Sequence, residues 1–249
     1  IDDCLLFSPV AARIVAVIRD FAAKSGLRAR DPNTGKGTLR RLVIREGKGT
    51  GEVMVNVIAE TDISGHMGPL SKELPEAVAE LRSLYAGSAH SPRLLWGRPY
   101  IEEILDDLSL RVYPFSFFQP NPKTAEALYG RMKAASEIRG DERVLGLYCG
   151  AGAIELFLAR HVKEAKGIDS SAESIACARE NAVLNGLKNV RFHRDRAETA
   201  VGRKEGGLKT IYEPKEIIPF DFFPQTSHFE VLAILEKQAR PFHADPDRS

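Results

Sequence analysis

The spacing of apolar residues changes twice along the chain, and each change predicts a different kind of element. Over residues 8–26 apolar side chains recur at helical spacing and Gly26 follows as a stop signal, which predicts an amphipathic helix. The next runs, at residues 39–44 and 53–58, are rich in β-branched residues and flank the glycine-rich turn 47–51. These runs predict a β-hairpin.

The middle of the chain has weaker signals. Residues 75–85 carry an apolar spacing that predicts a further helix, and the glycines and prolines of residues 87–99 predict a loop. After Val112, Tyr113 and Pro114 the character of the sequence shifts. We therefore expect a domain boundary near residue 113, which divides the chain into parts 1–113 and 114–249.

Beyond residue 139 short apolar runs alternate with helical patterns. In order, the pattern predicts a strand at 144–148, a glycine-rich turn and helix through 159, a strand at 165–168, a helix at 172–184 and a strand at 189–192. Such strand and helix alternation is typical of the first half of a doubly wound parallel sheet. The predicted fold class of this part is therefore α/β.

Composition limits the partners without naming them. The 249 residues are 43% hydrophobic, enough for two unequal domains with cores, and 35 Lys and Arg balance 34 Asp and Glu to a net charge of +1. Nucleic-acid contact must then come from a local patch. The hairpin offers a basic edge, although solvated charge on an exposed strand is the commoner meaning of such a pattern; its residues are Arg40, Arg41, Arg45 and Lys48.

Targeting and cysteine signals are sparse. No run of about 18 apolar residues occurs and the first residues lack the order of a signal peptide, so we expect a cytoplasmic protein without a membrane partner. The three cysteines are scattered with no CxxC pair, which fits neither a disulfide framework nor a complete zinc site. No protein partner can be inferred from the sequence.

The glycine-rich turn after the first predicted strand of the α/β part is the first candidate site. Gly150 and Gly152 let the backbone approach a ligand, and Asp169, seventeen positions after Gly152, can accept hydrogen bonds from ribose hydroxyls. The third glycine of the dinucleotide motif is missing, because position 155 is Glu155. The turn therefore favours S-adenosylmethionine over NAD.

Three stretches in order resemble one family. They are residues 117–121 (Phe-Phe-Gln-Pro-Asn), residues 147–152 together with 167–169, and residues 221–230 near the end. Together they resemble the S-adenosylmethionine-dependent RNA uracil-5-methyltransferases, which act on ribosomal and transfer RNA. The resemblance implies a Rossmann-like class I methyltransferase domain preceded by a smaller α+β domain with RNA contacts, to which the hairpin is also similar.

The resemblance implies roles for individual residues. Gln119, Tyr148 and Asp169 would contact S-adenosylmethionine, Asn121 would lie near the target base, and Glu230 would be the general base. Each has a plainer reading as well, since a single residue carries little information and Gln119, for example, could be an ordinary loop amide.

The mechanism that the family implies needs a residue that this chain lacks. A cysteine thiolate adds to carbon 6 of uracil, carbon 5 takes the methyl group, and a carboxylate then removes the proton from carbon 5. The family's Ser-Cys-Asn-Pro and Asp-Pro-Pro-Arg motifs are absent here. Cys149 is a poor substitute, because the family has a cysteine in that turn too and uses another for catalysis.

The same comparison predicts an incomplete sheet. Residues 199–211 stand where the family has two further βα units, so two middle strands would be missing unless the C-terminal hairpin pairs directly with the first strand. Gly146, where the family usually has Asp, predicts weaker cofactor binding. Cys4 resembles the last cysteine of an iron–sulfur set whose partners would lie upstream, so we expect an N-terminally truncated chain and a cluster only in a longer form.

Three functions remain open at this point. The leading one is an RNA uracil-5-methyltransferase by descent, internally deleted and inactive. The alternative is a non-catalytic remnant that binds S-adenosylmethionine or RNA. A small-molecule methyltransferase would need no cysteine but would leave residues 222–230 unexplained.

Overall fold

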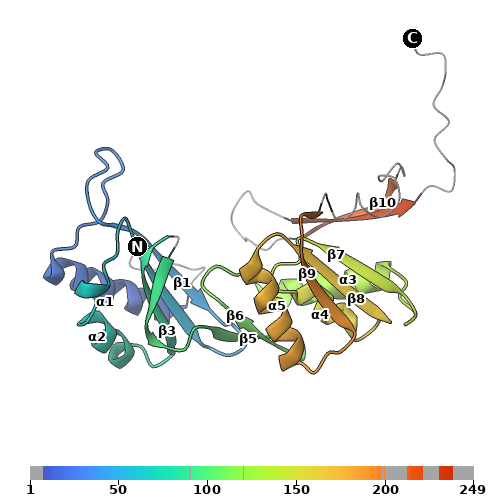
Figure 1. Ribbon diagram of the computed structural model, residues 1–249, viewed down its shortest axis with the longest axis horizontal. Helices are drawn as coiled ribbons and strands as arrows, with labels where there is room; N and C mark the ends of the chain where they lie inside the picture. The colour runs from blue at the N-terminus through green and yellow to red at the C-terminus, as the bar shows by residue number, and fades with distance from the viewer. Residues whose placement is uncertain are drawn as a thin grey trace, which may run out of the picture. The chain divides into compact units, whose positions relative to one another are not determined.

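The chain folds as two compact units (Figure 1). The computed structural model describes residues 8–89, 91–119, 121–197, 199, 212–220 and 230–237. The first unit comprises Ile1–Ile104 with Arg111–Pro114, and the second comprises Leu105–Leu110 with Phe115–Ser249. The functional division at residue 113 stays a prediction. Within the described part of the chain, no helix combines the length and apolarity needed to cross a membrane.

The first unit is a four-stranded sheet with helices against one face (Figure 1). Strands lie in the order β1-β2-β3-β4, with β2 and β3 parallel and the outer pairs antiparallel. The elements are α1 (Pro9–Ser25), β1 (Leu39–Glu46), β2 (Val53–Ala59), the short 3-10 helix η1 (Ser64–His66), α2 (Leu70–Ala77), β3 (Leu81–Ser88) and β4 (Ser91–Gly97).

Local sequence explains α1 and the first hairpin. Pro9 opens α1, where its missing N–H costs nothing, and Gly26 ends it in the left-handed region at φ 72°. The apolar stripe of α1 packs through Ile14, Ile18 and Phe21 onto the inward-facing residues of β2. The predicted helix and the predicted hairpin are both confirmed.

Two predictions in the middle of the chain are wrong. The expected helix at 75–85 is instead the end of α2 followed by β3, and the expected loop at 87–99 contains β4. Parallel pairing of β3 with β2 supplies a partner that local apolar spacing does not reveal. Pro92 is tolerated in β4 because β4 is an edge strand, where one row of N–H groups needs no strand partner.

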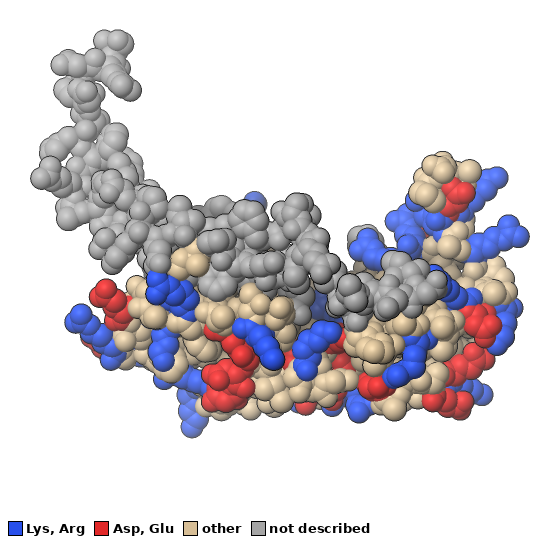
Figure 2. Space-filling view, turned by 180° about the vertical axis from the view of Figure 1, so that it is seen from behind, with Lys and Arg blue, Asp and Glu red and all other residues tan. Residues whose placement is uncertain are grey.

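Basic side chains gather around the loop between α1 and β1, as Figure 2 shows. Arg30 and Arg40 both pair with Glu60, the first at 3.1 Å. In the predicted basic edge, Lys48 pairs with Glu46, whereas Arg41 is exposed. The acidic partners neutralise part of this surface.

The second unit holds the predicted βαβαβ arrangement. Strands β7, β8 and β9 are parallel neighbours in that order, and β10 and β11 form an antiparallel pair of their own. The elements are α3 (Pro122–Ala135), β7 (Arg143–Leu147), α4 (Ala153–Ala159), β8 (Glu164–Asp169), α5 (Ala172–Leu184), β9 (Val190–Arg194), β10 (Tyr212–Phe220) and β11 (Glu230–Lys237). This is the expected Rossmann-like α/β architecture.

The core of the second unit lies between the parallel sheet and helices α3, α4 and α5. Right-handed crossovers in one direction place α4 and α5 on the same face of the sheet. A further hairpin, which sequence reasoning missed, consists of β5 (Ile101–Leu105) and β6 (Leu108–Val112). It adds Leu105, Leu108 and Leu110 to this core.

The other face of the parallel sheet is left partly open. Leu145 and Leu147 of β7 are 52% and 40% exposed, although parallel strands normally have both faces covered. In the described residues β7 is an edge strand, and direct pairing with the C-terminal hairpin does not form. The apolar face of β7 is therefore accessible to water.

We expect the double change Leu145→Thr and Leu147→Thr to lower the binding of a fluorescent hydrophobic dye. Both side chains are exposed, so the free energy of unfolding should change by less than about 1 kcal/mol. Dye titration and chemical denaturation measure the two effects. Val144→Thr is the control, since Val144 of the same strand packs on the core and its replacement should destabilise the protein. Unchanged dye binding in the double variant would contradict the open-face assignment.

Candidate functional site

The turn from β7 to α4 has a backbone that few sequences adopt. Tyr148, Gly150 and Gly152 have φ values of 57°, 54° and 83°, all in the left-handed region. For a residue with a side chain, such as Tyr148, this conformation costs roughly 1–2 kcal/mol. A strained residue of this kind at the end of a parallel strand is typical of a ligand site.

Hydrogen bonds hold the turn against the neighbouring elements. The Cys149 N–H donates to the Ile168 carbonyl at 3.0 Å, and the Asn181 amide of α5 donates to the Ala151 carbonyl at 3.3 Å. Phe117, from one of the three predicted family stretches, has its backbone within 4 Å of where a Cβ on Gly150 would lie. The turn is therefore fixed by β8, by α5 and by the segment that precedes α3.

Close packing explains why position 152 needs glycine. A Cβ atom there would lie 2.6 Å from the Phe192 ring and 3.0 Å from the Ala178 Cβ. Phe192 is buried, so it cannot move aside without opening the core. Gly150 differs, because its neighbourhood has room and only its positive φ requires glycine.

Asp169, the last residue of β8, is the centre of the predicted cofactor site. Its Oδ2 accepts from the Gly150 N–H at 3.0 Å and its Oδ1 accepts from the Ser171 N–H at 2.8 Å. An ionised carboxylate has about four acceptor positions, so two remain for a ligand. The structure thus joins Asp169 directly to the glycine turn, a contact that the sequence did not indicate, and the roles expected of both toward a ligand stay predictions.

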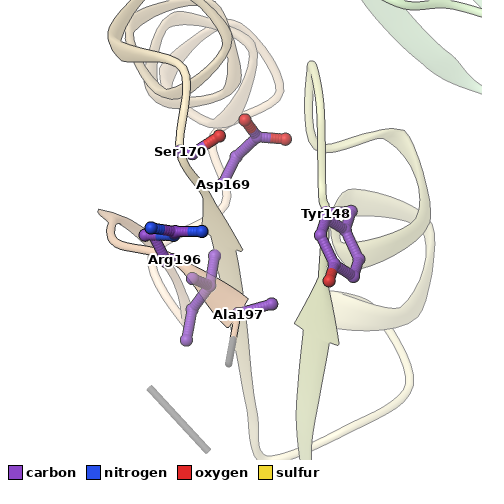
Figure 3. A pocket seen from close by; sticks show the side chains of 6 residues that line it. Tyr148, Asp169, Ser170, Arg196 and Ala197 are labelled. Carbon is purple, nitrogen blue, oxygen red and sulfur yellow. The ribbon is translucent and has the colours of Figure 1, made fainter. Parts of the chain in front are cut away.

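A small pocket of about 160 Å³ opens beside Asp169 (Figure 3). In Figure 3 the Tyr148 ring lies on one side and Arg196 and Ala197 lie on the other. The lining residues follow or end three adjacent parallel strands; they are Tyr148, Ile168, Asp169, Ser170, Arg196 and Ala197. Because cofactor-sized pockets usually measure about 300–1,000 Å³, this one has room for part of a nucleoside cofactor.

Glu155 is an unexpected buried acid beneath the turn. Its side chain is 3% exposed, and its Oε2 has no hydrogen-bond partner among the described residues. Burial first, and the nearby charge of Asp169 to a lesser extent, raise the pKa of Glu155 to about 7. Glu155 therefore holds a proton across most of the acidic range.

The cysteines are held in environments that favour the thiol. Burial, followed by the nearby carboxylates of Glu155 and Asp169, raises the pKa of Cys149 far above its ordinary value. Burial also raises the pKa of Cys177 to about 11, and that side chain is 2% exposed. Neither group is a ready nucleophile, because nucleophilic attack needs the thiolate.

The remaining predicted site residues are only partly located. Asn121 caps α3, with its Oδ1 accepting from the Thr124 N–H at 3.2 Å, and Gln119 is half-buried just before it. Glu230 is the first residue of β11 and pairs in register with Phe220. Cys4 and residues 221–229 lie outside the described residues. Among the residues that the structure does describe, no cluster of three potential metal ligands occurs. The roles expected of these residues stay predictions.

Sequence reasoning missed four members of this region. Ser170, Arg196 and Ala197 line the pocket, and Glu155 lies under the turn. The first three follow parallel strands, so the rule that ligands bind at the carboxyl ends of strands could have indicated them. In the sequence, Glu155 is notable only because it stands where the dinucleotide motif has its third glycine. Its burial depends on the tertiary structure.

Comparison with known proteins gives one family. The family model described as tRNA (uracil-5-)-methyltransferase matches residues 50–206. Uncharacterised RNA methyltransferases from Halalkalibacterium halodurans and Caldanaerobacter subterraneus subsp. tengcongensis are 28% and 32% identical. The matches cover 94% and 95% of this chain but 64% and 65% of the relatives, so the chain spans just under two thirds of their length.

A solved structure extends the comparison to three dimensions. The Pyrococcus abyssi tRNA (uracil-54, C5)-methyltransferase, in complex with S-adenosyl-L-homocysteine, is similar with a TM-score of 0.73 at 25% identity. The match covers 95% of this chain and 69% of that protein. The likeness therefore includes both units of the fold.

The lengths of the sequence matches also carry information. The match to the Halalkalibacterium halodurans relative runs over 293 positions, whereas 94% of the 249 residues here is about 234 residues. Roughly 60 aligned positions of that relative thus have no counterpart in this chain.

The raised pKa of Glu155 predicts a pH-dependent stability. Unfolded chain releases the proton near the ordinary value of 4.5, whereas the folded protein holds it to about 7. The stabilisation is therefore complete below pH 4.5 and is lost as pH rises through 7, a fall of roughly 3 kcal/mol. Glu155→Gln should remove this fall in denaturant unfolding between pH 5 and 8.

The control for this prediction is Glu173→Gln. Glu173 is also in the first turn of a helix, α5, but it is exposed. Its replacement should leave the pH dependence of the parent intact. If the parent and Glu155→Gln instead show the same pH dependence, the carboxyl is not buried as described.

Proposed function

Because the chain belongs to the tRNA (uracil-5-)-methyltransferase family, we propose that its second unit binds S-adenosylmethionine at the turn between β7 and α4. The chain would descend from enzymes that methylate carbon 5 of a uridine in RNA. One observation carries the proposal: the Asp169 carboxylate and the strained Tyr148 turn meet in a single pocket at the carboxyl edge of a parallel sheet.

The residues present fit the nucleoside half of this cofactor. Asp169 keeps acceptor positions for two ribose hydroxyls, and the Tyr148 side chain, which is 70% exposed, offers a ring face to a base or a ribose. Gly150 has no side chain and an open neighbourhood, so a ligand can approach the backbone of the turn there. When bound, S-adenosylmethionine supplies an electrophilic methyl group.

Other residues receive roles by resemblance to the family. Gln119 would add an amide contact to the cofactor, and Asn121 would keep its amide N–H₂ available to a target base while its Oδ1 caps α3. Glu230 would accept the proton from carbon 5 as the general base. An RNA substrate, whether transfer or ribosomal, agrees with the family of the relatives.

The first unit is the proposed RNA-contacting part. Arg41 is exposed, and the loop between α1 and β1 adds exposed Arg28, Arg30 and Lys36. Pairing of Arg30 and Arg40 with Glu60 lowers the net charge, so this surface would supply positioning contacts to phosphate rather than strong binding. We place the protein in the cytoplasm, where such an RNA would be met.

We further propose that this chain transfers no methyl group to uridine. Carbon 5 of uracil is a poor nucleophile until a group adds at carbon 6, and a thiolate is the side chain best suited to add and later leave. The raised pKa values of Cys149 and Cys177 support the absence of that thiolate among the described residues. The aligned positions missing relative to the Halalkalibacterium halodurans protein agree with a lost segment.

The same observations favour a non-catalytic second candidate. A chain that retains the Asp169 pocket but lacks a nucleophile would bind S-adenosylmethionine or RNA without reaction. Assays of methyl transfer with labelled cofactor, on unmodified RNA and on small acceptors, separate the two candidates. Transfer to small acceptors alone would indicate a third function.

Asp169→Ala should weaken S-adenosylmethionine binding. Loss of hydrogen bonds to a ribose and of the tie to Gly150 costs about 1–3 kcal/mol, which corresponds to roughly 5- to 150-fold in the dissociation constant. Calorimetry measures the constant, and circular dichroism checks the fold. Asp141→Ala, an exposed residue before β7, is the control and should bind like the parent. Equal binding by Asp169→Ala would show that the ribose assignment is wrong.

Incubation with 5-fluorouridine RNA should give no covalent adduct. Fluorine at carbon 5 blocks proton removal, so an enzyme with a working nucleophile becomes trapped on the RNA. Denaturing electrophoresis detects such a complex. An adduct that disappears in Cys149→Ala would overturn the proposal and make the cysteine of the turn the nucleophile.

A further inference from the structure

The Glu155 carboxyl group fills the space that a side chain at position 146 would need. A Cβ atom on Gly146 would overlap the Glu155 carboxyl group, lying 2.6 Å from its Cδ. Gly146 belongs to β7 and is not among the glycines with positive φ, so its backbone would accept any residue. The space taken by Glu155, and not the conformation of the strand, therefore demands glycine at position 146.

The Glu155 carboxyl is buried beneath the turn, and one of its oxygens lacks a hydrogen-bond partner among the described residues. Glu155 is 3% exposed, and the oxygen concerned is Oε2. The charge of Asp169 raises the pKa of Glu155, and the charge of Glu155 in turn raises the pKa of Cys149. Asp169 and Cys149 are the titratable groups that face Glu155, and no described basic side chain lowers its pKa. A buried acceptor left in this state costs free energy unless a ligand completes it.

We infer, resting on the cofactor site proposed above, that Glu155 is a positioning residue of this site and that its carboxyl, reaching from α4 into the space beside Gly146, pairs with the positively charged methionine end of the bound cofactor. Where the family usually has an Asp on the strand, this chain has Gly146 on β7, and Glu155 of α4 would supply the carboxyl group instead. Gly146 and Glu155 are therefore coupled, because position 146 accepts no side chain while the Glu155 carboxyl fills the space beside it.

Ionisation of the Glu155 carboxyl should make the affinity for S-adenosylmethionine depend on pH. A carboxyl that is neutral in the free protein must release its proton to pair with a cation, so binding and ionisation are coupled. With a pKa of about 7, roughly a tenth of the sites are ionised at pH 6 and nine tenths at pH 8. Because only the ionised form pairs, S-adenosylmethionine affinity should rise about tenfold over this range.

The first experiment tests the shared space without any cofactor. Gly146→Asp should lower the thermal midpoint by roughly 5 °C or more, because two carboxyl groups cannot fit one buried space. Glu155→Ser combined with Gly146→Asp should recover most of that loss, since one carboxyl is again present. Gly130→Ala, at a helical glycine with open surroundings, is the control and should not destabilise. A stable Gly146→Asp, or an absence of recovery, overturns the coupled pair.

The second experiment tests the charge by calorimetry with S-adenosylmethionine and adenosine at pH 6 and 8. In the parent, S-adenosylmethionine should bind about tenfold more tightly at pH 8, whereas adenosine, which has no methionine end, should not respond. Glu155→Gln should abolish the response and weaken S-adenosylmethionine binding without affecting adenosine. Glu173→Gln should behave like the parent.

The outcomes separate the two proposals. If S-adenosylmethionine binds Glu155→Gln as tightly and with the same pH response as the parent, the role of Glu155 is wrong while the cofactor site stands. If the parent binds neither S-adenosylmethionine nor adenosine, the cofactor site and the charge pairing are both wrong, and the unfolding experiment alone decides whether Gly146 and Glu155 are coupled.

Discussion

The Asp169 carboxylate, which accepts N–H groups from Gly150 on one side and Ser171 on the other, is the interaction on which the site depends. It joins the turn after β7 to the start of α5 and so fixes the ends of two parallel strands relative to each other. A turn with three left-handed residues would not hold its shape unaided, since each departs from the conformation that an ordinary chain prefers. The strain at Tyr148 persists because this tie and the hydrogen bond from Cys149 to Ile168 determine it.

Burial beneath the turn has two opposite chemical consequences. It raises the pKa of Glu155 to about 7 and leaves Oε2 without a partner among the described residues, so that, as we propose, release of the proton would let the carboxyl pair with a cationic ligand. The same low polarity, with the nearby carboxylates, keeps Cys149 as a thiol and so withholds a nucleophile. Both consequences agree with the proposal that the site holds a charged cofactor and does not attack a base.

The two faces of the parallel sheet in the second unit differ in how well they are covered. Helices α3, α4 and α5 cover one face and form a continuous core with β8 and β9. The opposite face of β7 exposes Leu145 and Leu147, and β10 and β11 pair only with each other in the described residues. The turn after β7 is supported from the covered face, by Phe192 and by Asn181 of α5.

The sequence by itself determined the order of elements from β7 to β9, the helix α1, the first hairpin and the glycine-rich turn before Asp169, because periodicity, glycines and strand ends are local signals. It failed at β3, where parallel pairing with β2 overrides local preference, and at β4, which pairs with β3 as an edge strand. Only the tertiary structure decided that Gly146 makes room for Glu155, since the burial of Glu155 and its closeness to the Gly146 backbone depend on how α4 packs on β7. The pKa of a carboxyl follows from the same packing, and no residue pattern records it.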